Sequence, residues 1–184
     1  MDKLTIMPSK LQGAAVVKTD PFEDNRGSFN RFFCMDELKE YLQAKSVAVI
    51  NFSLSHDVGT IRGLHFQNPP FAEIKMVRCL RGRVFDVMVD LRKESPTFGQ
   101  WHGELLTPEN VKMILIPEGF AHGFQVLEKE SELLYVHTAP YSKKHESGVR
   151  FDAPELGIEW PLPSRNLSER DLKLQSFSKN LYNE

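Results

Sequence analysis

Apolar and polar residues alternate along much of the chain, and this pattern is typical of β-strands that turn one face toward a core. Residues 84–91 (VFDVMVDL) show it most clearly, with Phe85 and Val87 on one face and Asp86 and Asp90 on the other. A strand of this kind needs a partner layer to cover its apolar face.

Three further segments have the composition of strands. They are residues 111–116 (VKMILI), which Pro117 stops, and residues 119–127 and 132–138, which a charged turn would join as a hairpin. Strands at this spacing, separated by Gly, Pro and Asn turns, predict an all-β sandwich or barrel.

Helical periodicity is rare. Residues 35–44 (MDELKEYLQA) predict one helix, with Asp36 as its cap and with Leu38 and Leu42 on a shared face.

Residues 167–174 (LSERDLKL) predict a second, shorter helix near the end of the chain. Ser168 is its expected N-cap, and Asp171 occupies the third position of its first turn.

The composition adds limits to this picture. The chain has 184 residues, 41% of them hydrophobic and 26% charged, as in an ordinary soluble domain. The net charge of −2 gives no basic field for nucleic acid or a membrane surface, and no segment approaches the roughly 20 apolar residues of a membrane helix. Two cysteines are too few for a disulfide framework, and the N-terminus lacks a signal-peptide pattern. We therefore expect one cytoplasmic domain over residues 1–184, with a loose polar tail at about 176–184.

The densest group of reactive side chains lies in residues 59–75 (GTIRGLHFQNPPFAEIK). An Asn-Pro-Pro turn divides it into two segments that we expect to form adjacent strands. His65 and Gln67 share a face of the first segment, and Glu73 and Lys75 share a face of the second. These two polar faces would line one pocket; the alternative is a rim of solvated charges on an outer sheet face.

The direction of one side chain in this group depends on a glycine. Strict alternation puts Arg62 on the face opposite His65, whereas a β-bulge at Gly63 would re-aim one of the two.

Three shorter motifs carry further candidate residues. PEGFAHG contains His122, LYVHTAPY contains Tyr135 and Tyr141, and the DNRG turn contains Arg26. Each has a simpler structural explanation: a histidine satisfied by a neighbour, aromatic packing within a barrel, and an arginine on an exposed loop.

Taken together, these stretches resemble the dTDP-4-dehydrorhamnose 3,5-epimerase family of nucleotide-sugar epimerases. The matching segments follow the family's order from about residue 20 to 171: FEDNRGSF, INFSLSHDVGTIRGLHFQNPP, VFDVMVDLRKESPTFGQW, IPEGFAHGFQVL, LLYVHTAPY, ESGVRFDAPELGIEWPL and LSERD. The resemblance implies a cupin-type jelly-roll β-barrel with a few short helices that acts as a homodimer. It also implies a substrate that is a nucleotide-linked 4-keto-6-deoxy sugar, in the biosynthesis of deoxysugar precursors such as those of lipopolysaccharide.

The resemblance also assigns roles. It makes His65 the catalytic base, Asp171 the carboxylate that holds it, Tyr135 the proton donor and Lys75 the cation beside the sugar's carbonyl oxygen. The positions that it implies for substrate binding are Arg26, Asn51, Arg62, Gln67, His122, Tyr141, Glu146 and Arg170.

This chemistry suits those residue types. A ketone at C4 acidifies the hydrogens on C3 and C5, and removing one of them gives an enolate that can be reprotonated on the other face. Histidine titrates near neutral pH, a carboxylate fixes its tautomer, and a cation stabilises the developing oxyanion. No electrons are transferred overall, so we expect neither a redox cofactor nor a metal.

One position departs from the family. Members that act on dTDP sugars usually carry a glutamate shortly after the RG turn, and Arg31 stands there in this chain. GDP- or CDP-linked sugars are therefore alternative substrates, and inversion of C3, of C5 or of both stays open.

Two other classes of function remain as alternatives. A metal-dependent cupin enzyme would use His65, Glu73 and His122 as ligands, although Gln67 occupies the place of a second histidine. A non-catalytic sugar-nucleotide binding module would keep the arginines and lack the base or the acid.

Overall fold

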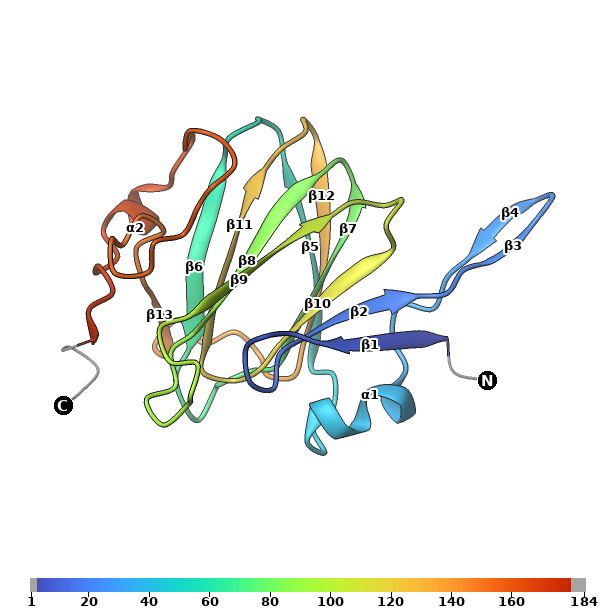
Figure 1. Ribbon diagram of the computed structural model, residues 1–184, viewed down its shortest axis with the longest axis horizontal. Coiled ribbons are helices and arrows are strands. Elements are labelled where there is room, and N and C mark those ends of the chain that lie inside the picture. Colours follow the sequence, from blue (N-terminus) through green and yellow to red (C-terminus); the bar gives the residue numbers. More distant parts are fainter. Residues whose placement is uncertain (1–2, 180–184) are drawn as a thin grey trace.

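Two antiparallel β-sheets face each other in residues 3–179, the part of the chain that this computed structural model describes (Figure 1). The six-stranded sheet consists, in order, of β1 (Leu4–Pro8), β2 (Ala15–Thr19), β10 (Lys112–Ile116), β7 (Lys75–Arg81), β12 (Ser131–His137) and β5 (Val49–Ser55). The five-stranded sheet consists of β13 (Glu146–Gly148), β6 (Ile61–Gln67), β11 (Phe120–Val126), β8 (Val84–Asp90) and β9 (Trp101–Leu106). The predicted all-β barrel is confirmed.

Three smaller elements surround the sheets. A hairpin of β3 (Phe22–Asp24) and β4 (Gly27–Phe29) projects away from the barrel (Figure 1). Helix α1 (Met35–Leu42) lies beside β1 and β2, and the short helix α2 (Glu169–Leu172) lies beside β6. No helix within residues 3–179 has the length and apolar character needed to cross a membrane.

The core has three apolar layers. The inner layer fills the space between the sheets and includes Val77, Met88 and Phe124. A second layer packs α1 against the outer face of the six-stranded sheet, and the predicted pair Leu38 and Leu42 is fully buried there. Full burial of a leucine side chain contributes about 1.5–3 kcal/mol to stability.

The third layer covers the outer face of the five-stranded sheet with the C-terminal segment. Val149, Leu156 and Phe177 of that segment pack with Leu64 and Val89 of the sheet. Phe177 is only 1% exposed, so the predicted loose tail is wrong at this position. The rest of that prediction, residues 180–184, lies outside the described residues.

Two pairs of strands that the sequence predicted to be neighbours are not paired in the structure. The segments predicted as a hairpin form β11 and β12, but β11 pairs with β6 and β8 whereas β12 pairs with β5 and β7. The predicted adjacent strands β6 and β7 also lie in different sheets. Both predictions are wrong for the same reason: alternation identifies the faces of a strand and carries no information about its partner.

The helix boundaries also differ in part. Cys34 occupies the N-cap position of α1 without a side-chain hydrogen bond, and Asp36 lies inside the first turn, so the predicted Asp36 cap is wrong. In α2 the predicted cap is present, because the Ser168 side chain accepts a hydrogen bond from the Asp171 backbone N–H.

A bulge interrupts β6 at Gly63, which is one of the two arrangements that the sequence left open. The pairing register between β6 and β11 shifts there, and Gly63 has φ +120°. A Cβ at this position would lie 2.6 Å from the His122 carbonyl oxygen and 2.7 Å from the Gly123 Cα. Only glycine fits, and the bulge re-aims β6 beside His65.

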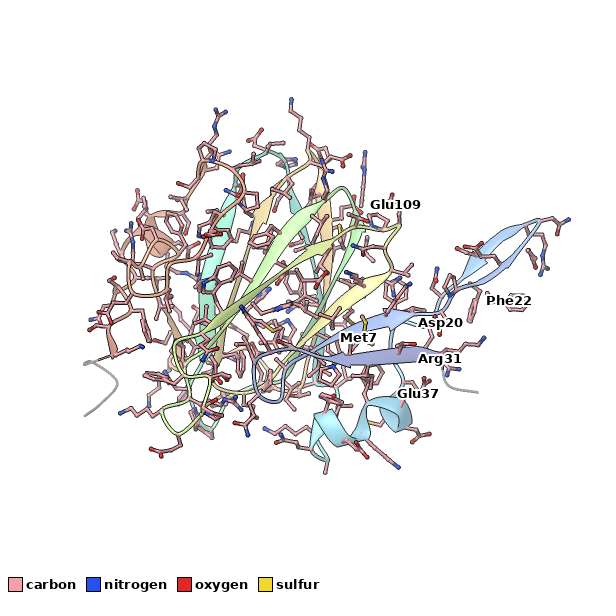
Figure 2. The ribbon with its side chains drawn as sticks, in the orientation of Figure 1. Met7, Asp20, Phe22, Arg31, Glu37 and Glu109 are labelled. Carbon is pink, nitrogen blue, oxygen red and sulfur yellow. The ribbon has the colours of Figure 1, made fainter. Side chains whose placement is uncertain are left out.

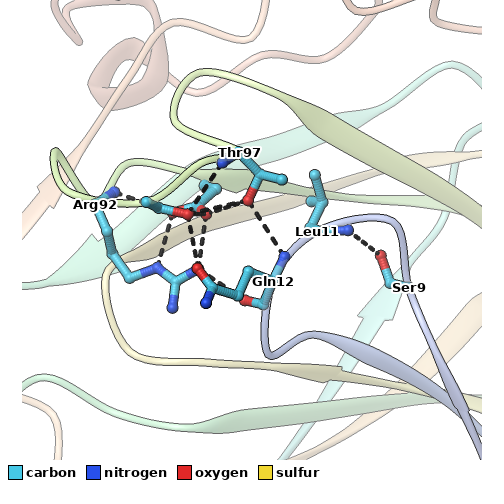
Figure 3. Close-up of polar contacts among 7 residues, drawn as sticks. Ser9, Leu11, Gln12, Arg92 and Thr97 are labelled. Carbon is cyan, nitrogen blue, oxygen red and sulfur yellow. Dashed lines mark hydrogen bonds and ion pairs between the residues drawn. The ribbon is translucent and has the colours of Figure 1, made fainter.

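A buried polar network holds the loop that follows β8 (Figure 3). Asp90 is fully buried and accepts hydrogen bonds from Arg92, Ser95 and Thr97. Arg92 and Thr97 in turn bind the backbone of Gln12, in the turn between β1 and β2. Burial alone would raise the pKa of Asp90, but these donors hold it below its ordinary value. The network therefore joins the ends of the two sheets through an ionised carboxylate.

Candidate functional site

Three adjoining cavities of about 790, 210 and 330 Å³ meet at His65. The predicted site residues that line them come from both sheets and from the C-terminal segment: Asn51, Arg62, His65, Gln67, Lys75, His122, Tyr135, Tyr141, Glu146, Arg170 and Asp171. Arg26 is the predicted residue that does not line them. The fold thus collects residues that are far apart in the sequence around one imidazole.

His65 and Asp171 form the centre of the site. The His65 Nε2 lies 2.7 Å from the Asp171 Oδ1, although the two residues are 106 positions apart in the chain. The other carboxylate oxygen of Asp171 accepts from the Gly63 backbone N–H at 3.2 Å. Two local features therefore position this pair: the bulge in β6 that contains Gly63, and the Ser168 cap at the start of α2.

The charge of Asp171 determines the tautomer of His65. Burial alone would raise the pKa of Asp171, but the hydrogen bond and charge of His65 and the Gly63 N–H hold it below its ordinary value. An ionised carboxylate only accepts hydrogen bonds, so the His65 Nε2 carries the proton. Nδ1 then has the free lone pair, and it has no hydrogen-bond partner within residues 3–179.

Arg170 adds positive charge beside this pair. Its Nη2 lies 2.8 Å from the His65 Nε2, and its Nη1 donates to the Glu146 Oε2 at 2.9 Å. A guanidinium has no acceptor atom, so its approach to a protonated Nε2 is a contact between two donors. The carboxylates of Glu146 and Asp171 both pair with the Arg170 guanidinium and balance its positive charge.

Lys75 extends into the cavity from β7, in the opposite sheet. Its Nζ pairs with the Glu73 Oε1 at 3.3 Å, and the Glu73 Oε2 binds the His137 Nδ1 at 2.8 Å. Burial alone would raise the pKa of Glu73, but the His137 hydrogen bond and the Lys75 charge lower it below its ordinary value. An ionised Glu73 thus orients the ammonium group. This contact with His137 could not be predicted from the sequence, because it depends on β12 lying beside β7.

Tyr135 reaches the cavity from β12. Its Oη lies 3.0 Å from the Ser53 Oγ, and its ring stacks on His137 with a centroid distance of 6.0 Å. Burial raises the pKa of the Tyr135 hydroxyl above its ordinary value. Ser53 is a second residue that the sequence analysis missed, since only the pairing of β5 with β12 brings it near.

His122 forms a second, deeper histidine–carboxylate pair. Its Nε2 lies 2.9 Å from the Asp86 Oδ1, and both side chains are buried. Burial lowers the pKa of His122 and raises that of Asp86, so burial favours the neutral forms of both. The simpler explanation for this motif was a histidine whose hydrogen bond is satisfied by a neighbouring residue, and it describes this contact correctly. His122 also lines the cavity together with Lys75 and Tyr135.

Comparisons with known proteins identify the family of this chain. Residues 8–179 match the family model described as dTDP-4-dehydrorhamnose 3,5-epimerase. The chain belongs to this family.

Individual members of the dTDP-4-dehydrorhamnose 3,5-epimerase family cover nearly the whole chain. The enzyme of that name from Sinorhizobium fredii is 40% identical over 172 residues, which are 93% of this chain and 88% of the relative. The crystal structure of the one from Elizabethkingia anophelis matches with a TM-score of 0.91 and 35% identity, over 96% of this chain and 97% of that one. The structure of dTDP-6-deoxy-D-glucose-3,5-epimerase from Legionella pneumophila, in complex with dTDP-4-keto-L-rhamnose, has a TM-score of 0.89 at 36% identity and covers 97% and 94%.

The rim of the cavity carries Tyr141, which is 62% exposed and donates a hydrogen bond to the Glu146 Oε2 at 2.9 Å. Gln67 is engaged differently. Its amide donates to the carbonyls of Phe71 and Pro140 and accepts from the Ser142 N–H. The polar atoms of Gln67 therefore hold the two loops beside the rim.

Two arginines lie away from the cavities: the predicted site residue Arg26, and Arg31, which departs from the family pattern. Arg26 is at the tip of the projecting hairpin, 83% exposed, and pairs with Asp24 at 2.6 Å. Arg31 pairs with Glu37 of α1 at 2.5 Å, and Figure 2 shows both side chains on the side of the barrel near β1. Glu37 also accepts from the backbone N–H groups of Lys3 and Leu4. Arg31 thus helps to attach α1 to β1.

The metal alternative finds no support in the site. His65 binds Asp171, Glu73 binds His137 and Lys75, and His122 binds Asp86. Within residues 3–179 no group of three or more His, Cys, Asp or Glu side chains is arranged to hold a metal ion. The proposed ligand set thus consists of three residues that each have a different partner.

The lowered pKa of Asp171 predicts a pH-dependent effect of Asp171→Asn on stability. The wild-type carboxylate contributes stability that is fully present above its unfolded pKa of roughly 4 and is lost as the pH falls through the lower folded value. We expect the substitution to cost about 1–3 kcal/mol at pH 7, and less as the pH falls below 4. Urea denaturation at a series of pH values measures this.

Glu169→Gln is the matched control, because Glu169 lies on the same helix with a side chain that is 91% exposed. It should change the free energy of unfolding by less than about 0.5 kcal/mol. A cost of Asp171→Asn that is the same at pH 7 and pH 3 would contradict the assigned ionisation.

Proposed function

We propose that this chain inverts C3, C5 or both in a dTDP-linked 4-keto-6-deoxy sugar by removing and returning a proton. The observation that carries the proposal is the His65–Asp171 pair in a cavity that also holds Lys75 and Tyr135. The ligand named for the Legionella pneumophila enzyme supports a dTDP sugar, and the comparisons do not favour the GDP- or CDP-linked alternatives.

Proton removal is the task of His65. Its Nδ1 lone pair accepts the hydrogen on the carbon beside the ketone, and the C–H electron pair moves toward the carbonyl oxygen to form an enolate. Asp171 stabilises the resulting imidazolium through Nε2. The Lys75 ammonium, which Glu73 orients, stabilises the negative oxygen; a single donor of this kind contributes about 3–4 kcal/mol to the transition state.

Proton return is the task of Tyr135. It belongs to β12 of the six-stranded sheet, whereas His65 belongs to β6 of the five-stranded sheet, so the acid and the base approach the cavity from two sides. The raised pKa of its hydroxyl keeps Tyr135 protonated at neutral pH. Its O–H bond breaks as the new C–H bond forms on the face opposite the one that His65 attacked. No electrons are gained or lost overall, and these steps call for no redox cofactor.

The remaining cavity residues suit the nucleotide and the diphosphate. Arg62 and Arg170 supply guanidinium groups, whose planar fork matches phosphate oxygens. The exposed ring of Tyr141 offers a stacking surface for a base. A non-catalytic binding module would need the arginines and no base, so the presence of the His65–Asp171 pair favours catalysis.

We further propose a homodimer in which the β3–β4 hairpin of one copy reaches the cavity of the other. Arg26 lies outside the cavities of its own chain, on a hairpin that projects from the barrel (Figure 2). Phe22 and Phe29 on this hairpin are 60% and 74% exposed, which is an apolar surface that a second copy would cover. A cytoplasmic location is consistent with the two free cysteines, Cys34 and Cys79.

Deuterium exchange tests the catalytic proposal. The wild-type protein should incorporate solvent deuterium at C3, C5 or both of dTDP-4-keto-6-deoxyglucose in heavy water, as read by NMR or mass. His65→Ala should lower the exchange rate by at least about 100-fold, because the base is missing, while dTDP binding stays within about threefold. His102→Ala removes an imidazole outside the cavities and should keep wild-type exchange. Unchanged exchange in His65→Ala would remove His65 as the base.

A mixed dimer tests the exchange of hairpins. Arg26→Ala and His65→Ala homodimers should both turn over poorly. A heterodimer of the two variants, co-expressed with different tags and purified through both, would contain one site with an intact His65 and an intact Arg26 from the partner. It should recover about half of the wild-type rate, since one of two sites is complete. A heterodimer as inactive as its parents would show that Arg26 does not act in the partner's site.

A further inference from the structure

The Tyr135 hydroxyl makes one hydrogen bond to the described part of the protein. Within residues 3–179 the Ser53 Oγ, at 3.0 Å, is its one hydrogen-bond partner. The rings of His137 and His122 pack against the Tyr135 ring, and the His137 Nδ1 and the His122 Nε2 bind Glu73 and Asp86. Among the described residues, Ser53 is therefore the group from which Tyr135 can receive a proton through a hydrogen bond.

Ser53 is hydrogen-bonded to the buried phenol and belongs to a strand whose preceding residues are exposed. It is on β5, the edge strand of the six-stranded sheet, and it is half-buried, while Asn51 and Phe52 next to it are exposed. Its hydroxyl lines the same cavity as His65 and Lys75. A serine hydroxyl is a donor and an acceptor at once, so it can pass a proton in either direction.

The proposed epimerase reaction creates a need for such a path. Each inversion leaves Tyr135 as a tyrosinate and His65 as an imidazolium. Burial makes the tyrosinate costly, and Tyr135 lines the same cavity in which the proposed reaction takes place, so a bound sugar would compete with water for access to the phenol. Inverting two carbons in one binding event requires Tyr135 to regain a proton before the product leaves.

We propose that Ser53 relays protons from solvent to Tyr135 and so resets the acid while the sugar is still bound; this inference rests on the proposed epimerase activity. The Ser53 O–H bond breaks as the Tyr135 O–H bond forms, and a water molecule at the edge strand restores the Ser53 proton. The hydroxide that this leaves is neutralised by the proton that His65 releases to solvent. The net change is the transfer of one proton from imidazolium to tyrosinate.

An isosteric pair of variants tests the relay. Ser53→Thr keeps the hydroxyl, and Ser53→Val has the same shape without it; both β-branched residues suit an edge strand. Each variant is mixed with dTDP-4-keto-6-deoxyglucose in heavy water under rapid quench, and carbon-bound deuterium is counted per active site. Tyr135 starts protonated, so Ser53→Val should complete one inversion per site at nearly the wild-type rate. Its later inversions should be at least about tenfold slower, and the singly inverted sugar should accumulate.

Ser53→Thr is the control for this experiment. Ser53→Thr should show the wild-type time course, without a fast phase limited to one inversion. If Ser53→Val slows the first inversion as much as the later ones, Ser53 only positions Tyr135 and the relay is wrong. Equal steady-state rates for the two variants would also overturn it. If the wild-type protein incorporates no deuterium, the proposed function itself fails, and this result is separate from either outcome for Ser53.

Discussion

The hydrogen bond between His65 and Asp171 is the contact on which the organisation of the site depends. It joins a barrel strand to a four-residue helix 106 positions later in the chain. For the two to meet, β6 must bulge at Gly63, Ser168 must cap α2, and the C-terminal segment must pack on the outer face of the five-stranded sheet. The apolar layer that contains Val149 and Phe177 thus serves the chemistry indirectly, because it holds Asp171 in place.

A second constraint is that the site lies between two sheets. His65 comes from one sheet, and Lys75 and Tyr135 come from the other, so the proposed base lies on one side of the cavity and the proposed cation and acid lie on the other. The carboxylate of Asp171 is paired with His65 and the ammonium of Lys75 with Glu73, which offsets the cost of removing these charges from water. The proposed epimerisation uses these partners to keep one tautomer and one charge state ready before the substrate binds.

Features that depend on local sequence patterns could be predicted from the sequence. Features that depend on which strands pair with each other could not. Alternation found the strand at residues 84–90, helical spacing found Leu38 and Leu42, and the serine of LSERD was recognised as a cap. Periodicity could not show that β11 and β12 lie in different sheets, since a strand pattern is the same whichever strand lies beside it.

The missed site contacts have the same origin. Ser53 meets Tyr135, and Glu73 meets His137, only because β12 lies between β5 and β7. The family resemblance supplied His65, Asp171, Lys75 and Tyr135, which motif matching can identify without knowledge of the fold. It could not show that Arg26 lies outside the cavities of its own chain, because a motif gives a residue's position in the sequence and not the direction of its hairpin.

In the proposed mechanism, Asp171 holds the proton of His65 on Nε2 and leaves Nδ1 free to act as the base. ¹⁵N-labelled histidine NMR on the wild-type protein, at a pH where the ring is neutral, measures this directly. We expect Nε2 of His65 to show the chemical shift of a protonated nitrogen and Nδ1 to show that of an unprotonated one. The opposite tautomer, with the proton on Nδ1, would contradict it.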